Sequence, residues 1–244
     1  MNLREGVIIG IDKPYKMSSF GALAHIRFVL SKKAGFKVKV GHAGTLDPLA
    51  TGVLILCTGR ATKQIEQLQQ HTKEYTATLQ LGATTASYDM EHPVNETFPT
   101  EHITRERIEE VLKSLTGDIE QVPPAYSAVM VNGKRAYKLM RKGEEVELKA
   151  KPVRIDEIEL LRFDPDTMQA DIRVVCGKGT YIRSLARDIG EALQSGAYLT
   201  ALRRTRVGDI RVEDCHTFDN FNEWLAWQTI EDEATLSQQQ QTKK

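Results

Sequence analysis

The chain has 244 residues, with 33 basic and 33 acidic side chains, so its formal net charge at pH 7 is zero. A chain of this length buries enough apolar surface to fold without disulfides or structural metals, and it is long enough to be an enzyme. Its three cysteines are widely spaced and form no CxxC pair, which argues against a zinc knuckle and a disulfide framework. No stretch approaches the roughly 20 apolar residues of a membrane span. We therefore expect a cytoplasmic protein that does not enter a membrane.

The charges are unevenly distributed along the chain. Residues 213–244 hold seven acidic and two basic side chains, which leaves a net charge of +5 on the first 212 residues. Basic residues gather in two segments: Lys134, Arg135, Lys138, Arg141 and Lys142, then Lys178, Arg183, Arg187, Arg203, Arg204, Arg206 and Arg211. Such grouping suits a polyanion such as a nucleic acid, although charge alone fits an ordinary solvated surface equally well.

A strand and a helix open the chain. Residues 6–12, GVIIGID, have the continuous apolar character of a buried strand. The segment 18–35 predicts a helix, with Ser18 or Ser19 as its N-cap and Gly35 just beyond its end.

The next elements follow without strict alternation. Residues 52–57 predict an apolar strand and residues 61–69 a short helix. Residues 73–82 alternate apolar and polar side chains, as a half-buried strand does, and residues 104–115 predict an amphipathic helix that stops at Gly117.

Residues 122–143 combine paired prolines, a short strand, an Asn132-Gly133 turn and a basic stretch around Tyr137. This pattern predicts a protruding, cationic feature with one or two helical turns. Two long strands follow at 153–164 and 169–177.

A helix is predicted at 180–193, and a short amphipathic helix at 218–230 precedes a low-complexity tail that we expect to be disordered. Because strands outnumber helices and the two do not alternate strictly, we predict an α+β fold. Its central sheet is expected to be mostly antiparallel or mixed, with helices on its faces.

Signatures of common cofactor sites are lacking in the sequence. It contains no GxxxxGK[ST], no GxGxxG after a strand, no HExxH, no GxSxG and no zinc-deaminase pattern. The six histidines have no ligand-like spacing. We therefore expect neither a metal nor a cofactor.

One carboxylate stands out in residues 41–63, GHAGTLDPLATGVLILCTGRATK, where Asp47 is the only acidic residue. An isolated Asp-Pro pair is commonly just a turn. Here Gly44 and Gly52 allow a ligand to approach the backbone, while nearby threonines and leucines supply hydroxyls and apolar walls. A partly dry pocket disfavours a charged carboxylate, so we expect a cationic partner, an arginine, to keep it ionised.

These residues closely resemble the catalytic motif of the TruB family of tRNA pseudouridine synthases, approximately GHxGxLDPxAxGxLxxxxGxATK. Five further segments look like the family's other blocks, in the family's order: GVIIGIDKPYKMSS, KEYTATLQLGATTASYD, VPPAYSAVMVNGKRAYKLMRKG, CGKGTYIRSLARDIG and LRRTRVGDI. The resemblance extends from residue 6 to about residue 212.

The resemblance implies an enzyme of pseudouridine synthase-like fold that isomerises a uridine, conventionally position 55 in the T arm of tRNA, without metal or cofactor. It implies a catalytic domain at 1–212, with a thumb-like insertion at about 122–150. Such an enzyme must flip the nucleotide out of its stack. We expect a monomer.

Asp47 matches the family's nucleophile, which could attack either the sugar C1′ or C6 of uracil. Tyr75 matches the tyrosine that stacks on the target base; by pattern alone it would be a core aromatic. Arg183 matches the arginine that pairs with the catalytic aspartate; by pattern alone it would be a solvated helix residue.

Other positions match residues that bind RNA or shape the pocket. His42 matches a histidine that enters the space left by flipped bases, and Lys13 belongs to a block that shapes the active-site wall. Tyr181 and Leu202 match pocket residues that pattern alone would assign to the core. The thumb cations would hold phosphates: Lys134, Arg135, Lys138, Arg141 and Lys142.

The sequence departs from the family pattern in two places. Residues 213–244 are expected to form only a short helix and a polar tail, too short for the family's common PUA domain, which favours reliance on the T arm alone. Lys16 stands where the family often has glycine, so the local turn is expected to differ.

Two other functions stay open: a non-catalytic tRNA-binding or tRNA-folding protein of the same fold, and a carboxylate-dependent N-glycoside hydrolase. The second commonly needs two catalytic carboxylates, and only one is evident.

Overall fold

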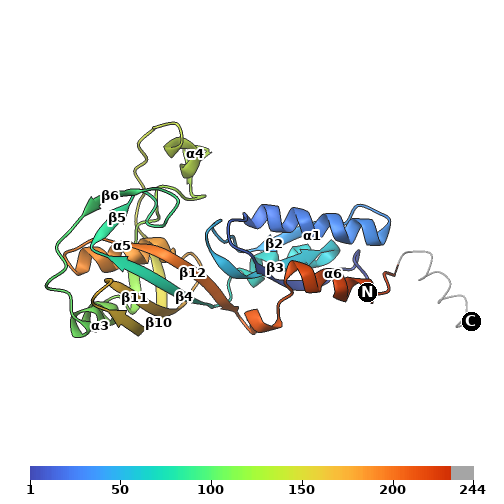
Figure 1. Cartoon of the computed structure of the whole chain (residues 1–244). Helices are drawn as coiled ribbons and strands as arrows, with labels where there is room; N and C mark the ends of the chain where they lie inside the picture. Colours follow the sequence, from blue (N-terminus) through green and yellow to red (C-terminus); the bar gives the residue numbers. More distant parts are fainter. Residues whose placement is uncertain (232–244) are drawn as a thin grey trace, which may run out of the picture. The chain divides into compact units, whose positions relative to one another are not determined.

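The structure is a computed structural model that describes residues 1–231 (Figure 1). It divides into two units: Met1–His71 with Arg204–Lys244, and Thr72–Arg203. The division falls within strand β12 (Ala197–Val207). The tail predicted to be disordered lies outside the described residues.

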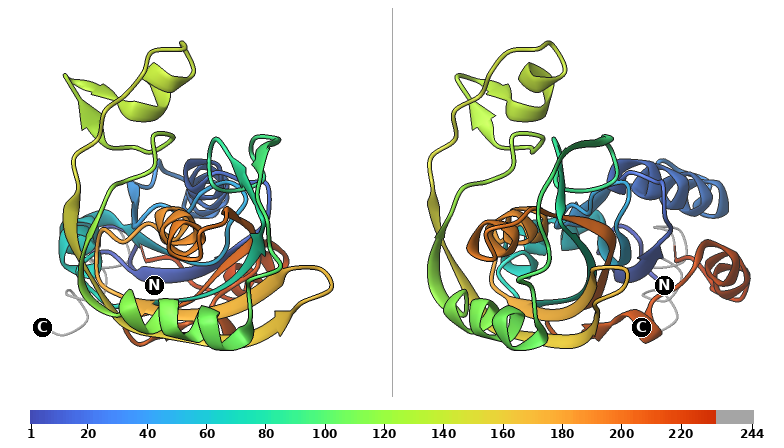
Figure 2. Two further views of the ribbon diagram at one scale, coloured as in Figure 1. Left: turned by 90° about the vertical axis from the view of Figure 1, so that its left-hand side faces the viewer. Right: turned by 60° about the vertical axis from the view of Figure 1, so that its left-hand side comes forward.

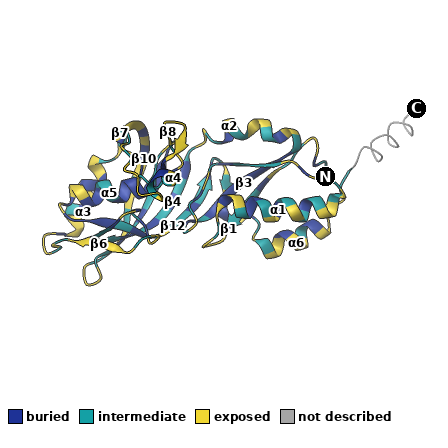
Figure 3. Ribbon diagram, turned by 90° about the horizontal axis from the view of Figure 1, so that it is seen from above, coloured by how far each residue is buried: buried dark blue, intermediate teal, exposed yellow. Residues whose placement is uncertain are grey.

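In the first unit, strand β3 (Thr51–Thr58) pairs antiparallel with β1 (Ile8–Lys13) and β2 (Val40–Ala43). Figure 3 shows the buried residues along β3. Successive side chains of a strand point to opposite faces. The continuous apolar run of β3 therefore contributes side chains to two hydrophobic cores, one on each face of the sheet. Leu54 and Leu56 pack beneath helix α1 (Ser19–Ala34). Val53, Ile55 and Cys57 pack on the side of η1 (Gly59–Gln64) and α2 (Ile65–Leu68).

Helix α1 begins and ends where its sequence predicts. The Ser18 side chain accepts a hydrogen bond from Gly21 N at 3.0 Å, and Gly35 ends the helix with φ 74°. Just before the helix, Lys16 has φ 61°. This left-handed conformation is the one that glycine adopts most readily, which accounts for glycine at that position in the family pattern.

After β12, a short strand β13 (Ile210–Arg211), a 3-10 turn η2 (Val212–Asp214) and helix α6 (Phe218–Ala226) complete the first unit. Strand β13 pairs with the end of β12. The apolar side of α6 inserts Phe221 into the core beneath α1, and Phe218 stacks on His25 with ring centroids 4.5 Å apart. The amphipathic helix predicted at 218–230 is therefore present, although it ends at Ala226, and it packs on the body of its unit.

In the second unit, four strands run antiparallel in the order β4 (Lys73–Leu81), β11 (Gln169–Cys176), β10 (Lys151–Asp164) and β7 (Gly117–Gln121). Every second residue of β4 is buried, as its alternation predicts. Helices α3 (Arg105–Ser114) and α5 (Ile182–Ala192) belong to the same unit, with a small β5–β6 ladder (Ala83–Thr85, Val94–Thr97).

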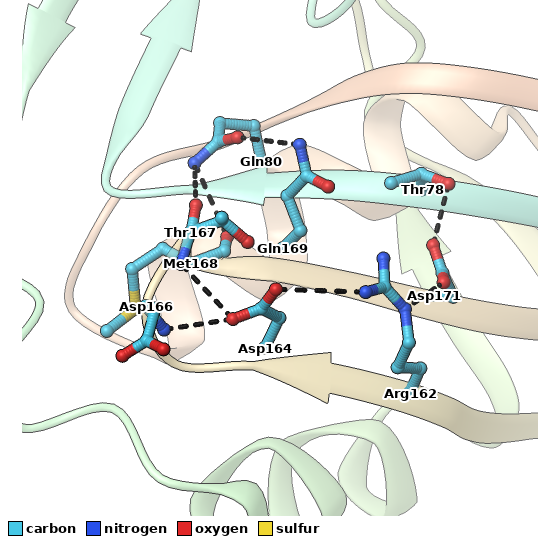
Figure 4. Close-up of polar contacts among 9 residues, drawn as sticks. All are labelled: Thr78, Gln80, Arg162, Asp164, Asp166, Thr167, Met168, Gln169 and Asp171. Atoms are coloured by element: carbon cyan, nitrogen blue, oxygen red, sulfur yellow. Dashed lines mark hydrogen bonds and ion pairs between the residues drawn. The ribbon is translucent and has the colours of Figure 1, made fainter.

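The β10–β11 hairpin closes with a polar turn (Figure 4). Asp164 Oδ1 accepts a hydrogen bond from Asp166 N at 3.0 Å, and Met168 takes φ 53° as the chain reverses. Beyond the turn, Asp171 joins the strands by accepting from Thr78 Oγ1 at 2.7 Å and from Arg162 Nε at 2.8 Å.

Residues 122–143 form the protruding feature that their sequence predicts (Figure 2). Two-residue strands β8 (Met130–Val131) and β9 (Lys134–Arg135) are joined by Asn132 and Gly133, with φ 48° and 77°. Positive φ at both central residues is the geometry of a type I′ hairpin turn. Helix α4 (Ala136–Met140) follows as little more than one turn.

The predicted α+β class with a largely antiparallel sheet is confirmed. The prediction did not identify β2, β7, β12, β13 or the β5–β6 ladder. The predicted helix 61–69 is a 3-10 turn followed by one turn of α-helix.

Candidate functional site

Asp47 lies in the turn between β2 and β3, and its main chain is fixed from both sides. Ala50 N donates to Asp47 O at 3.1 Å, which closes the Asp-Pro turn. Before the turn, the buried Ser19 hydroxyl both accepts from Leu46 N at 2.8 Å and donates to Leu46 O at 2.9 Å. The first residue of α1 therefore fixes the backbone next to the half-buried Asp47.

Lys13, at the end of β1, holds the other side of the turn. Its side chain is fully buried, and Nζ donates to Pro14 O at 2.9 Å, Met17 O at 2.6 Å and Pro48 O at 3.3 Å. Burial lowers the pKa of Lys13 to about 8, while attraction to Asp47 acts in the opposite direction. Lys13 is therefore mostly a cation at neutral pH, and it is tied to the carbonyl oxygen of Pro48, the residue after Asp47.

A second buried cation, Arg204 from β12, fixes the start of the same loop. Its side chain is 2% exposed, and it donates to Val53 O at 2.7 Å, Gly44 O at 3.1 Å and Thr45 O at 3.5 Å. A Cβ on Gly52 would lie 2.1 Å from Arg204 O, so only glycine allows β3 to approach β12 this closely. Sequence reasoning counted Arg204 in a basic cluster but did not assign it to the site.

His42 precedes this loop on β2 and is half-buried. Burial, and then the charge of Arg204, lower its pKa, which favours the neutral imidazole at pH 7. Within residues 1–231, the buried Nδ1 atom has no hydrogen-bond partner. The first unit thus brings together four groups at one loop: Lys13, His42, Asp47 and Arg204.

In the second unit, the buried Tyr75 sits in β4, opposite Val174 of β11. Arg183, on the first turn of α5, is only 4% exposed, so the solvated helix arginine suggested by pattern alone is wrong. Its guanidinium donates to Ser87 O at 3.2 Å and Tyr126 O at 3.0 Å.

A buried carboxylate, Asp89, also faces Arg183, with Oδ2 3.7 Å from Nε. Its other oxygen accepts from Ser87 Oγ at 2.5 Å and Glu91 N at 2.9 Å. Sequence reasoning quoted the segment that contains Asp89 but assigned it no role; an acid in a short polar loop gives no sign of burial.

The remaining predicted residues also belong to the second unit. Tyr181 is the N-cap residue of α5, and its backbone N donates to Gln121 Oε1 at 2.8 Å. Leu202 is half-buried on β12. The five cations predicted to bind phosphate, Lys134, Arg135, Lys138, Arg141 and Lys142, are all exposed on β9 and α4 or just after it. Arg141 forms a 3.4 Å ion pair with Glu91.

The predicted site residues are therefore divided between the units, with Asp47 in one and Tyr75 and Arg183 in the other. The pairing of Asp47 with Arg183 stays a prediction. Within residues 1–231, no three His, Cys, Asp or Glu side chains are grouped so as to hold a metal ion. In the same range, every helix is too short or too polar to cross a bilayer.

The sequence matches two family models. Residues 31–182 match the N-terminal domain of TruB family pseudouridylate synthase, and residues 183–239 match the C-terminal domain of tRNA pseudouridylate synthase B. The chain is 62% identical to tRNA pseudouridine synthase B of Bacteroides thetaiotaomicron, over 96% of this chain and 98% of the relative. It is 49% identical to the protein of the same name from Flavobacterium johnsoniae, over 91% and 96% of the two chains.

Solved structures share the fold. The fold resembles a chain in the crystal structure of a Cbf5-Nop10-Gar1 complex, with a TM-score of 0.66 and 28% identity. The match covers 91% of this chain and 55% of that one, so this chain spans about half the length of the solved relative. A chain of an H/ACA RNP bound to a substrate RNA containing 2′-deoxyuridine matches with a TM-score of 0.65 and 27% identity. The chain belongs to the TruB family of tRNA pseudouridine synthases.

Proposed function

We propose that this tRNA pseudouridine synthase converts uridine 55 in the T arm of tRNA to pseudouridine, with Asp47 as its nucleophile and without metal or cofactor. Family membership and relatives named tRNA pseudouridine synthase B support the reaction and the RNA substrate. The observation that carries the role of Asp47 is the fixation of its turn by two buried cations, Lys13 and Arg204. An aspartate in an ordinary surface turn needs no such support.

The isomerisation breaks the N1–C1′ bond of the nucleoside, turns the uracil and forms a C5–C1′ bond. The C5 proton leaves, and N1 gains a proton, so no oxidant or other reactant is consumed. A carboxylate can start this sequence by attacking either C1′ or C6. Either attack needs a carboxylate held in a defined direction, which a turn fixed on both sides provides.

The other predicted residues have roles around the extruded base. Tyr75 stacks on the uracil, Tyr181 and Leu202 line the pocket, and Arg183 pairs with the Asp47 carboxylate. His42 enters the space that the flipped nucleotide leaves in the RNA, for which a neutral, flat, hydrogen-bonding ring is suited. Lys13 supports the wall beneath the Asp47 turn.

Residues 1–212 form the catalytic domain in this proposal, and residues 122–150 form a thumb that closes on the T loop. The five exposed thumb cations bind phosphates there. Residues 213–244 add a short helix and a polar tail. The enzyme acts as a monomer in the cytoplasm, where tRNA is its substrate.

Tritium release from T-arm RNA labelled at C5 of uridine tests the proposal. Asp47→Asn keeps the shape and removes the charge, and it should abolish release. Asp209→Asn, in the exposed turn between β12 and β13, is the matched control and should release tritium at the wild-type rate. Full activity of Asp47→Asn would contradict the nucleophile assignment.

The same assay separates the alternatives. RNA binding without tritium release by the wild type would identify a non-catalytic tRNA-binding protein. Free uracil among the products would identify an N-glycoside hydrolase. Comparable kcat/KM for an isolated T-arm hairpin and for whole tRNA is expected if the T arm is the recognised element, and a large preference for whole tRNA would contradict this.

A further inference from the structure

The loop after β5 holds Arg183 from two directions. Ser87 contributes its main-chain carbonyl oxygen, 3.2 Å from Nη1, and Asp89 contributes its carboxylate, 3.7 Å from Nε. Both residues are buried, and the Ser87 hydroxyl donates to the Asp89 carboxylate. The two groups that face the guanidinium are separated in sequence by one residue, Tyr88.

Tyr88 has a backbone conformation that aromatic residues rarely adopt. Its φ is 58°, in the left-handed region. Tyr88 N donates to Thr85 O at 3.2 Å, and the Thr85 hydroxyl donates to Asp89 O at 2.6 Å. The chain therefore reverses tightly at Tyr88, which lets a carbonyl on one side of it and a carboxylate on the other reach the same guanidinium. Strain of this kind persists only where surrounding contacts enforce it.

Two contacts enforce it here. Tyr88 O accepts a 3.0 Å hydrogen bond from Leu199 N of β12. The Tyr88 ring lies 5.5 Å from the guanidinium carbon of Arg187, one helical turn after Arg183 on α5. Arg187 is itself held by Asp188 Oδ1 at 2.6 Å and by Val122 O at 3.1 Å. The loop that positions Arg183 is thus attached to the helix that carries Arg183.

We propose that Tyr88 is a positioning residue for the isomerisation: its left-handed backbone aims Ser87 O and the Asp89 carboxylate at Arg183 and fixes the guanidinium for its role at the reacting centre. The inference rests on the proposed function, in which Arg183 pairs with the nucleophile. The property that matters is the backbone conformation at residue 88, more than the phenol group.

The test compares substitutions that differ in their tolerance of positive φ. Tyr88→Val disfavours the left-handed region strongly, because its Cβ is branched, whereas Tyr88→Gly and Tyr88→Asn accept it. Kinetics of tritium release on T-arm RNA should show kcat lowered about tenfold or more in Tyr88→Val, with KM changed less than about threefold. Tyr88→Asn and Tyr88→Gly should recover most of the lost kcat.

A control separates positioning from general stability. Met168, in the β10–β11 turn (Figure 4), has nearly the same backbone conformation, with φ 53°, and its carbonyl oxygen accepts a 2.9 Å hydrogen bond from Leu81 N of β4. Met168→Val should lower the melting temperature as Tyr88→Val does and leave kcat unchanged. Equal losses of kcat in the two valine variants, or equal losses in Tyr88→Val and Tyr88→Gly, would overturn the inference.

A double variant shows whether Tyr88 acts through Arg183. If it does, Tyr88→Val should lower kcat much less in an Arg183→Lys background than in the wild type. If Tyr88→Val lowers kcat by the same factor in both backgrounds, the inference is overturned, while the role of Arg183 remains intact. Wild-type kcat in Arg183→Lys alone would instead contradict the proposed function.

Discussion

Arg204 Nε donates a 2.7 Å hydrogen bond to Val53 O, which joins the side chain of β12 to the main chain of β3 within the first unit. The same guanidinium reaches Gly44 O and Thr45 O, at the start of the loop that carries Asp47. One buried cation therefore connects the core of the sheet to the candidate nucleophile. Its removal should affect both stability and catalysis.

Replacing Arg204 with methionine keeps much of its length and leaves three carbonyls without their donor. We expect the free energy of unfolding to fall by about 3 kcal/mol, because buried acceptors lose charged partners. We expect kcat to fall at least about tenfold, because the Asp47 loop is released. Urea unfolding and tritium release measure the two effects. Arg211→Met, at an exposed site on β13, should change stability by less than about 0.5 kcal/mol. Equal effects of the two substitutions would contradict this role for Arg204.

Gly52→Ala tests the close approach of β3 and β12. The new Cβ would meet Arg204 O at 2.1 Å at a residue whose φ is 103°, so both a clash and backbone strain are introduced. Gly143→Ala is the matched control: its φ is 75°, and its new Cβ meets no other heavy atom of the described residues within 4 Å beyond its chain neighbours. We expect about 1 kcal/mol of destabilisation at Gly143 and at least about 3 kcal/mol at Gly52, measured by urea unfolding. Similar losses in the free energy of unfolding would show that backbone strain alone, without a clash at Gly52, destabilises both variants.

Lys13 should make stability depend on pH in an alkaline range. Its pKa is lowered by burial from 10.5 to about 8, so between these values the unfolded chain binds a proton that the folded chain has lost. The unfolded state then holds more protons, and stability rises with pH. The free energy of unfolding of the wild type, relative to Lys13→Met, should increase by up to about 3 kcal/mol as the pH rises from 8 towards 10.5.

Lys39→Met is the control for this titration, because Lys39 is exposed next to the start of β2. The change in its free energy of unfolding between pH 8 and 10.5 should differ from that of the wild type by less than about 0.5 kcal/mol. If the difference in free energy of unfolding between wild type and Lys13→Met does not change with pH, the buried ammonium keeps its ordinary proton affinity.

Local signals in the sequence were sufficient for most of the fold. Ser18 and Gly35 mark the ends of α1, alternation marks β4, and Asn132-Gly133 marks the thumb hairpin. Strand β12 was missed because its segment, AYLTALRRTRV, mixes three arginines with apolar residues and shows no clear period. Its strand character comes from neighbouring strands and from the burial of Arg204, which no local pattern reports.

The candidate site was only partly predictable for a related reason. Asp47 stood out because its loop is unusual in composition, and the family resemblance supplied Tyr75 and Arg183. Arg204 and Asp89 were missed because their importance lies in partners distant in sequence or in the burial of a polar loop. A buried charge is recognised by the groups that compensate it, and these are assembled only by the fold.

The exposed cations of the thumb should make RNA binding depend on salt. Each cation that neutralises a phosphate releases a counterion. Its loss therefore makes the negative slope of log K against log salt less steep by about 0.9. The double variant Lys134→Gln/Lys138→Gln removes two exposed thumb cations and should reduce the magnitude of the slope by nearly 2 for T-arm RNA. Lys113→Gln, at an exposed position of α3 outside the thumb, should leave the slope unchanged. Titrations of binding at several salt concentrations provide the measurement, and an unchanged slope in the double variant would show that the thumb does not contact phosphate.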